Sequence, residues 1–421
     1  MKKVLLVSAV LLLAVSLFVS GCGQTSTSDD ENTGTITGTV TDFYSGDVIS
    51  GALIMVGLGT VTAETDSSGA YSIDTGTTGT VTVSAVATGY AAKTIVCNSS
   101  TVNFDLTSHS GVGEEKYGTI IGRLVNADGT AYQTPEVVAA FNQYGQHIYS
   151  STSTGNGYWI KDEVPIGTVT LMFWRYNDSY EVDGIAYKTG ITLTESGSVD
   201  AGTLTIQPKS SWKTLSGTIT PPSPMASAIS APDYYTVTAN LGYGVGLLVA
   251  TTSATADYSL EIPPTVDDNT YTIYAHAVST AEGSSTYTAV YSHDTSISAD
   301  TTKNFTLPSV AIISAPAANA EVSATPTFSW AGDADLYSVS LSSGTHGHIW
   351  SVLTTATSAQ YPDFPATVAS TFELQSGEQY YWSFSSYTGS DININSYGGA
   401  IDLFNNTDGV TNRPTRFFTI E

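Results

Sequence analysis

Two histidines separated by one glycine, His346 and His348, have the spacing in this chain that best suits a metal ion. Side chains two positions apart on a β-strand point to the same face, so both imidazoles could bind one zinc ion. No third ligand follows at a usual spacing, and histidines beside glycine in a polar segment are more often solvated. We therefore predict no metal site, and His346 and His348 are the candidates to check.

Serine, histidine and acidic residues are all present, but none of them stands in a catalytic motif. The sequence contains no G-x-S-x-G elbow, no H-E-x-x-H zinc motif and no P-loop. Residues 386–414 are rich in glycine, asparagine and aspartate, so we expect a long exposed loop there. We predict a protein that is not an enzyme and holds no cofactor. An envelope hydrolase that uses the 386–414 loop is the least favoured alternative.

Aromatic side chains offer a different chemistry, because sugars stack their apolar faces on tryptophan and tyrosine rings. Trp174, Tyr176 and Tyr180 surround an Asn-Asp pair and could form a ligand-binding platform. Phe173 and Trp174 are neighbours that cannot both point inward from a regular strand, so we expect one of them to be exposed. A carbohydrate-binding or adhesion protein is therefore our first alternative function.

Several acidic turns could bind calcium weakly, although none matches the EF-hand loop. Aspartate, asparagine and glycine also build β-turns without metal, because they tolerate left-handed backbone and bond their own chain. We favour this structural interpretation. The turns are Asp66-Ser67-Ser68-Gly69, Asn126-Ala127-Asp128-Gly129 and Asp333-Ala334-Asp335.

The chain is strongly acidic, with 38 Asp and Glu against 13 Lys and Arg and a formal charge of −25. Such a surface repels the phosphates of nucleic acids and anionic lipid headgroups. Nucleic acid is therefore excluded as a partner.

The start of the chain has the order of an export signal. Lys2 and Lys3 precede an apolar run over residues 4–19, and small residues then lead to Cys22. This order resembles the lipobox of bacterial lipoproteins. The resemblance implies that residues 1–21 are a signal peptide and that Cys22 is acylated, as with palmitate, and holds the protein on a lipid bilayer. The residue after the cysteine is glycine rather than aspartate, which implies outer-membrane sorting in a Gram-negative cell.

Composition predicts the fold class. Residues 22–34 lack large apolar side chains and are expected to be a polar tether. Only 12% of the residues in the chain are charged, and Thr, Val and Tyr favour strands while Gly and Ser favour turns. We therefore predict an all-β chain of tandem antiparallel β-sandwiches of immunoglobulin or transthyretin type. Cys97 lies in a strand-like run and lacks a disulfide partner if Cys22 is acylated, so we expect it to be buried.

A pattern of strands and turns occurs three times. In residues 35–107 an alternating strand with Gly38 is followed by the turn 66–69 and a further strand. This order resembles the carboxypeptidase regulatory-like domain, a transthyretin-type sandwich, and the resemblance implies its fold without peptidase activity. The second copy, residues 117–207, and the divergent third copy, residues 212–308, carry the matching glycines Gly122 and Gly217.

The last segment, residues 310–421, has another pattern. Residues 374–380 resemble the L-x-P-G-x-x-Y turn of fibronectin type III domains, with Ser376 in place of the proline. The resemblance implies a sandwich in which the Tyr380 hydroxyl bonds back to the backbone. Alternation predicts a further set of core-facing aromatic residues, and a final strand over residues 416–420. The inward residues are Trp330, Tyr380, Trp382 and Phe384.

These features together predict a non-catalytic lipoprotein of the cell envelope that serves as a surface scaffold or binding module. Its partners would be the bilayer, through acylated Cys22, and either a polysaccharide or an envelope protein. The sequence does not separate these two ligands.

Overall fold

The structure is a computed structural model that describes residues 31–57, 61–109, 116–132, 137–142, 147–150, 156–177, 179, 182–221, 233–241, 245–252, 256–265, 270–279, 286–389 and 409–421. Within these residues the chain is almost entirely β-strand, with one short helix, α1 (Ala366–Phe372), and one 3-10 turn, η1 (Lys209–Ser211). The predicted all-β fold is confirmed. No helix in this part of the chain is long and apolar enough to cross a bilayer.

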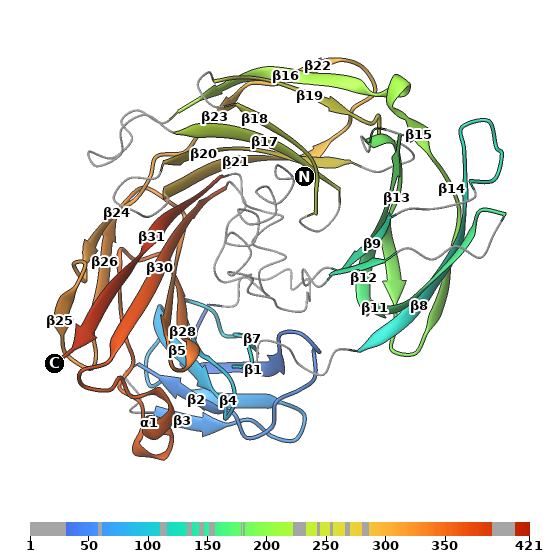
Figure 1. Cartoon of the computed structure of the whole chain (residues 1–421). Helices are drawn as coiled ribbons and strands as arrows, with labels where there is room; N and C mark the ends of the chain where they lie inside the picture. Colours follow the sequence, from blue (N-terminus) through green and yellow to red (C-terminus); the bar gives the residue numbers. More distant parts are fainter. Residues whose placement is uncertain are drawn as a thin grey trace.

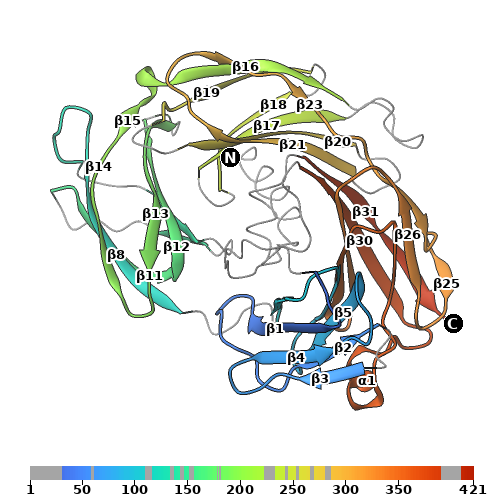
Figure 2. The same ribbon diagram turned by 180° about the vertical axis from the view of Figure 1, so that it is seen from behind.

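The strands form four β-sandwiches that follow one another around a ring (Figure 1). In the second, third and fourth sandwiches one sheet lies on the outside of the ring and the other lines its inside, as the reverse view also shows (Figure 2). The predicted boundaries at 107, 207 and 308 remain predictions, because contacts between neighbouring sandwiches are extensive.

The first sandwich packs the sheet β4-β1-β7 against the strands β3-β2-β5-β6. Their apolar side chains form one core, which includes Cys97, as predicted. Lys93 and Asp105 form a buried ion pair between β6 and β7, so it ties the two sheets together. The strands are β1 (Thr35–Asp42), β2 (Leu53–Val56), β3 (Val61–Glu64), β4 (Ala70–Asp74), β5 (Val81–Val86), β6 (Ala92–Cys97) and β7 (Phe104–Leu106).

The second sandwich packs the sheet β11-β8-β14 against the sheet β10-β9-β12-β13-β15. The rings of Trp159 and Phe173 meet in its core with their centroids 4.9 Å apart. The strands are β8 (Tyr117–Val125), β9 (Val137–Asn142), β10 (His147–Ser150), β11 (Tyr158–Pro165), β12 (Gly167–Tyr176), β13 (Val182–Leu193), β14 (Ser198–Thr205) and β15 (Gln207–Pro208).

The third sandwich repeats this plan, with β19, β22 and β23 paired to β16 in one sheet and β18-β17-β20-β21 in the other. Its core continues into the second sandwich, because Met172 and Tyr187 belong to the same apolar cluster as Leu215 and Ile273. The strands are β16 (Lys213–Thr220), β17 (Tyr234–Leu241), β18 (Val245–Thr252), β19 (Asp257–Ile262), β20 (Tyr271–Ser279), β21 (Thr286–Thr295), β22 (Thr301–Thr302) and β23 (Phe305–Thr306).

The fourth sandwich packs β24-β26-β29 against β28-β27-β30-β31, with β25 paired to β31. The four predicted inward aromatic residues all lie in its core. The backbone N–H of Gln375 donates to the Tyr380 hydroxyl over 2.9 Å, which confirms the predicted return of this side chain to the backbone. The strands are β24 (Ile312–Ala315), β25 (Ala320–Val322), β26 (Thr327–Ala331), β27 (Leu336–Ser343), β28 (Gly347–Thr354), β29 (Ser358–Gln360), β30 (Gln379–Thr388) and β31 (Gly409–Ile420).

The repeated glycines have one structural role. Gly38 and Gly217 each lie opposite a tyrosine of the paired strand, Tyr71 and Tyr258. The Tyr71 hydroxyl donates to the carbonyl of Val102, and Tyr258 makes the equivalent bond to Lys303. A Cβ on Gly38 would lie 1.8 Å from the Val102 oxygen, and one on Gly217 would lie 2.0 Å from the Lys303 oxygen. Only glycine allows the strands to approach so closely.

Strand pairing also joins different sandwiches. β21 pairs with β31, and β28 pairs in parallel with β6, so one sheet from each of the third, fourth and first sandwiches joins a single continuous sheet. At the second of these junctions the indole N–H of Trp350 donates to the Thr94 hydroxyl over 2.8 Å. Unpaired edges invite association with other chains, and these junctions cover four of them.

The first and last sandwiches share a hydrophobic core as well. Met55, Val86 and Ala92 point away from the core of the first sandwich and into the apolar cluster of the fourth. There they belong to one cluster with Trp350 and Tyr361, which are fully buried. The two ends of the described chain therefore fold as one unit, and burial of this face is a large apolar gain.

The segment 386–414 differs from the expected loop. β30 runs to Thr388 and β31 begins at Gly409, while residues 390–408 lie outside the described residues. The final strand is therefore longer than the predicted 416–420. The physical reason is that its first half pairs with β21 of the third sandwich, which the sequence pattern of one sandwich does not reveal.

Candidate binding surface on the second sandwich

Four side chains project together from the face of β8 and β11 that points away from the core. On β8 these are Ile121 and Arg123, and on β11 they are Ile160 and Tyr158. The strands are paired so that Tyr158 lies beside Arg123 and Ile160 beside Ile121. We call these four side chains the Tyr158 face.

The Tyr158 face is open to solvent. Tyr158 is 56% exposed and Ile121 is 38% exposed, and both are among the few large apolar side chains so exposed in the described chain. The Arg123 guanidinium carbon lies 5.6 Å from the centre of the Tyr158 ring, a cation–π geometry. Arg123 also donates to the backbone oxygen of Asn156 over 3.5 Å, and the ion pairs among the described residues do not include it.

The end of this face away from Arg123 is acidic. Asp162 follows on β11 and is exposed. The Thr119 hydroxyl donates to its carboxylate over 2.8 Å, which holds the charge close to the sheet. Along the strands the face therefore runs from a cation and an aromatic ring, through two isoleucines, to a carboxylate.

The equivalent positions of the first and third sandwiches carry small or polar side chains. Aligned on the repeated glycines, they are Thr37, Thr39, Ala70 and Ser72 in the first and Ser216, Thr218, Asp257 and Ser259 in the third. In both of these sandwiches the central threonine is held by an asparagine: Thr39 donates to Asn103 and Thr218 donates to Asn304 through the backbone N–H and the hydroxyl.

Sequence reasoning missed the Tyr158 face although its signal was present. The three copies can be aligned on Gly38, Gly122 and Gly217, and only the second has large side chains at outward positions. Exposed apolar residues at positions that tolerate threonine are not required by the fold.

The residues predicted to form an aromatic platform are not part of the Tyr158 face. Phe173 is buried in the core of the second sandwich, and Trp174 is half-buried against the apolar cluster shared with the third. Neither side chain is therefore fully exposed, because the face that carries Trp174 is itself covered by a sandwich. Tyr176 is half-buried at the end of β12, and Tyr180 lies outside the described residues.

The histidine pair is not assembled on one strand. His346 lies in the turn before β28 and is exposed, and its backbone N–H donates to the Ser343 hydroxyl over 2.9 Å. His348 lies within β28, where burial, reinforced by nearby His109, lowers its pKa to about 4. Among the described residues no three His, Cys, Asp or Glu side chains gather as metal ligands would.

Two of the three acidic turns use a carboxylate internally. Asp66 accepts bonds from the N–H and hydroxyl of Ser68 and the N–H of Ala70, and these bonds lower its pKa. Asp128 accepts bonds from the N–H and hydroxyl of Thr130, with the same effect on its pKa. This geometry supports the structural interpretation of these turns.

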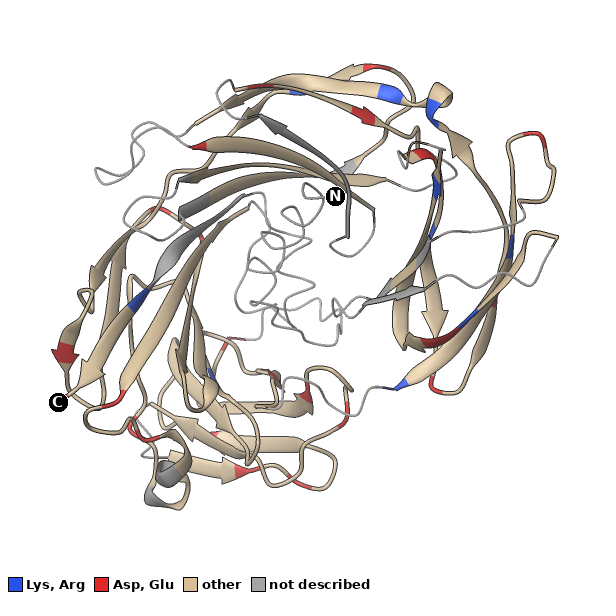
Figure 3. Cartoon of the chain, in the orientation of Figure 1, with Lys and Arg blue, Asp and Glu red and all other residues tan. Residues whose placement is uncertain are grey.

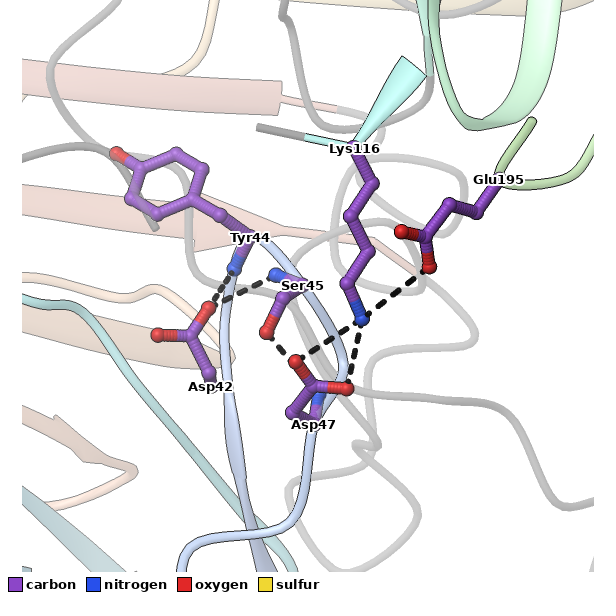
Figure 4. A network of polar contacts seen from close by, with 6 residues as sticks. All are labelled: Asp42, Tyr44, Ser45, Asp47, Lys116 and Glu195. Atoms are coloured by element: carbon purple, nitrogen blue, oxygen red, sulfur yellow. Dashed lines mark hydrogen bonds and ion pairs between the residues drawn. The ribbon is translucent and has the colours of Figure 1, made fainter. Parts of the chain in front are cut away.

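A polar network connects the first two sandwiches (Figure 4). Lys116 at the start of the second sandwich contacts both carboxylate oxygens of Asp47, at 3.0 and 3.1 Å, and reaches Glu195 at 4.0 Å. The bond from Lys116 is the main reason that the pKa of Asp47 is lowered. Acidic positions elsewhere are spread over all four sandwiches rather than gathered on one face (Figure 3).

A second aromatic cluster lies on the third sandwich, on the side of the sheet away from its core. The rings of His276, Tyr274, Tyr291 and His293 follow one another with centroids 5.6, 5.6 and 5.9 Å apart. Burial lowers the pKa of His276 to about 4. The motif Tyr-x-His occurs on both of the paired strands, and this repetition is the sequence signal that could have predicted the cluster.

Residues 35–107 match the carboxypeptidase regulatory-like domain family, as the sequence predicted. The match covers the first sandwich only. A comparison with curated protein sequences finds no match.

Several solved structures are similar to parts of this chain. The TIE protein of Bacillus anthracis is 12% identical with a TM-score of 0.19, and the likeness covers 65% of this chain and half of that one. The minor pilin of Streptococcus agalactiae is 13% identical with a TM-score of 0.22, over 41% of this chain and 96% of the pilin. A candidate carbohydrate-binding protein of Bacteroides uniformis is 10% identical with a TM-score of 0.19, over 49% and 98%. Likenesses this distant carry no argument about function.

Proposed function

We propose that this protein is a non-catalytic, lipid-anchored scaffold of the cell envelope that binds a partner through the Tyr158 face. One observation carries the binding role: four outward positions that are small or polar in the first and third sandwiches hold Ile121, Arg123, Tyr158 and Ile160 in the second. Exposed apolar side chains flanked by charge, together with tyrosine and arginine, are the composition of interaction surfaces.

The ring supports a scaffold role. Edge pairing and a shared core connect the first sandwich to the fourth, so the sandwiches hold one another in fixed positions. A rigid support reduces the entropy lost when a surface binds its partner. The fibronectin type III resemblance of residues 310–421 belongs to the same proposal, since that sandwich supplies both ring-closing edges.

The anchor is proposed from the sequence alone. Acylation of Cys22 would make the residues before Asn32 a tether between the bilayer and the first sandwich, in the outer membrane if the cell is Gram-negative. The predicted tether 22–34 is too long at its end, because Asn32 is buried and its side-chain amide donates to the carbonyls of Thr77 and Gly79. Metabolic labelling with a palmitate analogue should mark the wild-type chain in the membrane fraction. The Cys22→Ser chain should be unlabelled, and a wild-type chain that stays unlabelled in the cytosol would refute the anchor.

The binding role is tested by giving the second sandwich the side chains of the first. The variant Ile121→Thr, Arg123→Thr, Tyr158→Ala and Ile160→Ser should lose capture of its envelope partner while its melting temperature stays close to that of wild type. A matched control, Thr37→Ser with Ser72→Thr on the first sandwich, should keep capture. Equal capture by all three chains would rule out the Tyr158 face as the binding surface.

A carbohydrate is the second candidate ligand, and the exposure of the Tyr158 ring is the observation in its favour. Binding to a glycan array that is lost in Tyr158→Ala would establish it. Trp174→Ala would lower stability rather than remove a platform, because Trp174 packs between two sandwiches.

A further inference from the structure

The Tyr158 face has an order of charges that is complementary to itself. Arg123 and Tyr158 form one end, Ile121 and Ile160 form the middle, and Asp162 lies at the other end. When such a face meets a second copy with the strand direction reversed, the basic end of each lies over the acidic end of the other. A two-fold axis across the strands at the level of the isoleucines produces this arrangement.

The dimensions of a β-sheet make the contact possible. Neighbouring strands are about 4.8 Å apart, so Arg123 of one copy, facing Thr119 of the partner copy, can reach Asp162 on the next strand. The isoleucines meet their own counterparts near the axis, and facing sheets pack about 10 Å apart. The Thr119–Asp162 bond already holds the carboxylate in position to accept from the incoming guanidinium.

We propose that the occupant of the Tyr158 face is a second copy of this chain, in a two-fold dimer with Arg123 of each copy paired to Asp162 of the other. This inference rests on the proposed binding role of the face and names its partner. Arg123 is suited to the pairing because the ion pairs of the described chain leave it out. Attachment of many copies to one membrane would raise their local concentration.

Among the described residues at the level of the axis, one carboxylate opposes the contact. Asp200 on β14 is exposed and lies in register with Ile121, so it would face Asp200 of the partner copy. Its carboxylate accepts from the N–H of Gly202 over 2.7 Å, which turns part of its charge toward its own backbone. Asp200→Asn should therefore tighten the dimer by roughly threefold, because a like-charge contact is removed.

Charge reversal on the full chain in detergent tests the proposal by sedimentation at several protein concentrations. Arg123→Glu and Asp162→Lys should each weaken association at least about tenfold, because each places like charges together. The double variant Arg123→Glu with Asp162→Lys should restore association. Equal association of all four chains, or a double variant as weak as the single ones, would overturn the proposal, as would a wild-type chain that is monomeric throughout.

A second measurement locates the axis. Ile121→Cys chains in the membrane of the expressing cell should form dimers with a short bismaleimide cross-linker. Thr37→Cys and Ser216→Cys, at the equivalent positions of the first and third sandwiches, should not, nor should wild type, whose Cys97 is buried. Cross-linking of Ile121→Cys to a different protein would overturn the dimer while leaving the binding role of the face intact. If the chain neither captures a partner nor forms dimers, the binding role of the face and the dimer are both refuted.

Discussion

The first and third sandwiches differ from the second at positions that do not decide the fold. All three place an aromatic side chain over a glycine, with Tyr71 and Tyr258 in two of them and Trp159 in the other. On the opposite side of the same sheet, the small or polar side chains of the first and third sandwiches are replaced by the Tyr158 face in the second. The inner side of the sheet is thus constrained by packing, and the outer side is free to acquire function.

The strongest test of this comparison changes the repeated glycines. Gly38→Ala and Gly217→Ala should each lower the free energy of unfolding by about 3 kcal/mol, because the new methyl group meets a backbone oxygen that cannot move alone. Gly122→Ala should be costly as well, since its methyl group would lie 2.4 Å from the buried ring of Trp159. Urea titration measures all three. A loss below about 1 kcal/mol for Gly38→Ala would contradict the close approach.

Acid should destabilise the third and fourth sandwiches, which contain His276 and His348. Burial holds both pKa values at about 4, below the ordinary 6.5, so the unfolded chain binds more protons between these values. Stability is therefore present at pH 7 and falls as the pH drops from about 6.5 towards 4. Between pH 7 and pH 5 each histidine should lower the free energy of unfolding by about 2 kcal/mol. Urea titrations at both pH values should show a smaller acid loss for His276→Asn and His348→Asn than for wild type. An unchanged loss would be evidence against these assignments.

The first and third sandwiches place a tyrosine opposite the repeated glycine, and the second places a tryptophan there. Tyr71→Phe leaves the Val102 carbonyl without its side-chain donor, and Tyr258→Phe does the same to Lys303. Each should cost about 1–2 kcal/mol in thermal or urea unfolding. Tyr158→Phe, a change of an exposed tyrosine, should cost less than either, because water can replace whatever its hydroxyl bonds. A similar cost for all three variants would indicate that the hydroxyl bonds are not the cause.

The smallest expected effect concerns the asparagines that hold the outward threonines. Asn103→Ala and Asn304→Ala each remove two bonds to the threonine opposite, and because the site is exposed the cost should be about 1 kcal/mol. Thr203→Ala, the equivalent change in the second sandwich, should be neutral in the same urea titration. A large cost for Thr203→Ala would remove this difference between the sandwiches.

Much of the fold could be predicted from local patterns. Alternation identified the inward aromatic residues of the fourth sandwich, and the turn at residues 374–380 identified the bond to Tyr380. The glycine of each repeat aligns the first strands of the three copies, so the outward positions of these strands can be compared from the sequence. The Tyr158 face was accessible to the same reasoning, and it was missed because aromatic residues were weighed singly rather than by their place in the repeat.

Contacts between sandwiches were beyond the reach of the sequence. Trp174 looks like a surface ring because it directly follows the buried Phe173 on the same strand and so points to the opposite face. A neighbouring sandwich nevertheless covers that face. The pairing of β6 with β28 joins strands from opposite ends of the described chain, and no periodicity within either strand encodes its partner.

Residue order alone determined that this chain makes repeated β-sandwiches, because the two-residue period of strands and the special backbone of glycine are local properties. Which faces of those sandwiches remain open was decided only by the tertiary structure. Burial depends on what packs against a face, and here strands from distant parts of the chain cover Met55 and Trp174 but leave Tyr158 exposed.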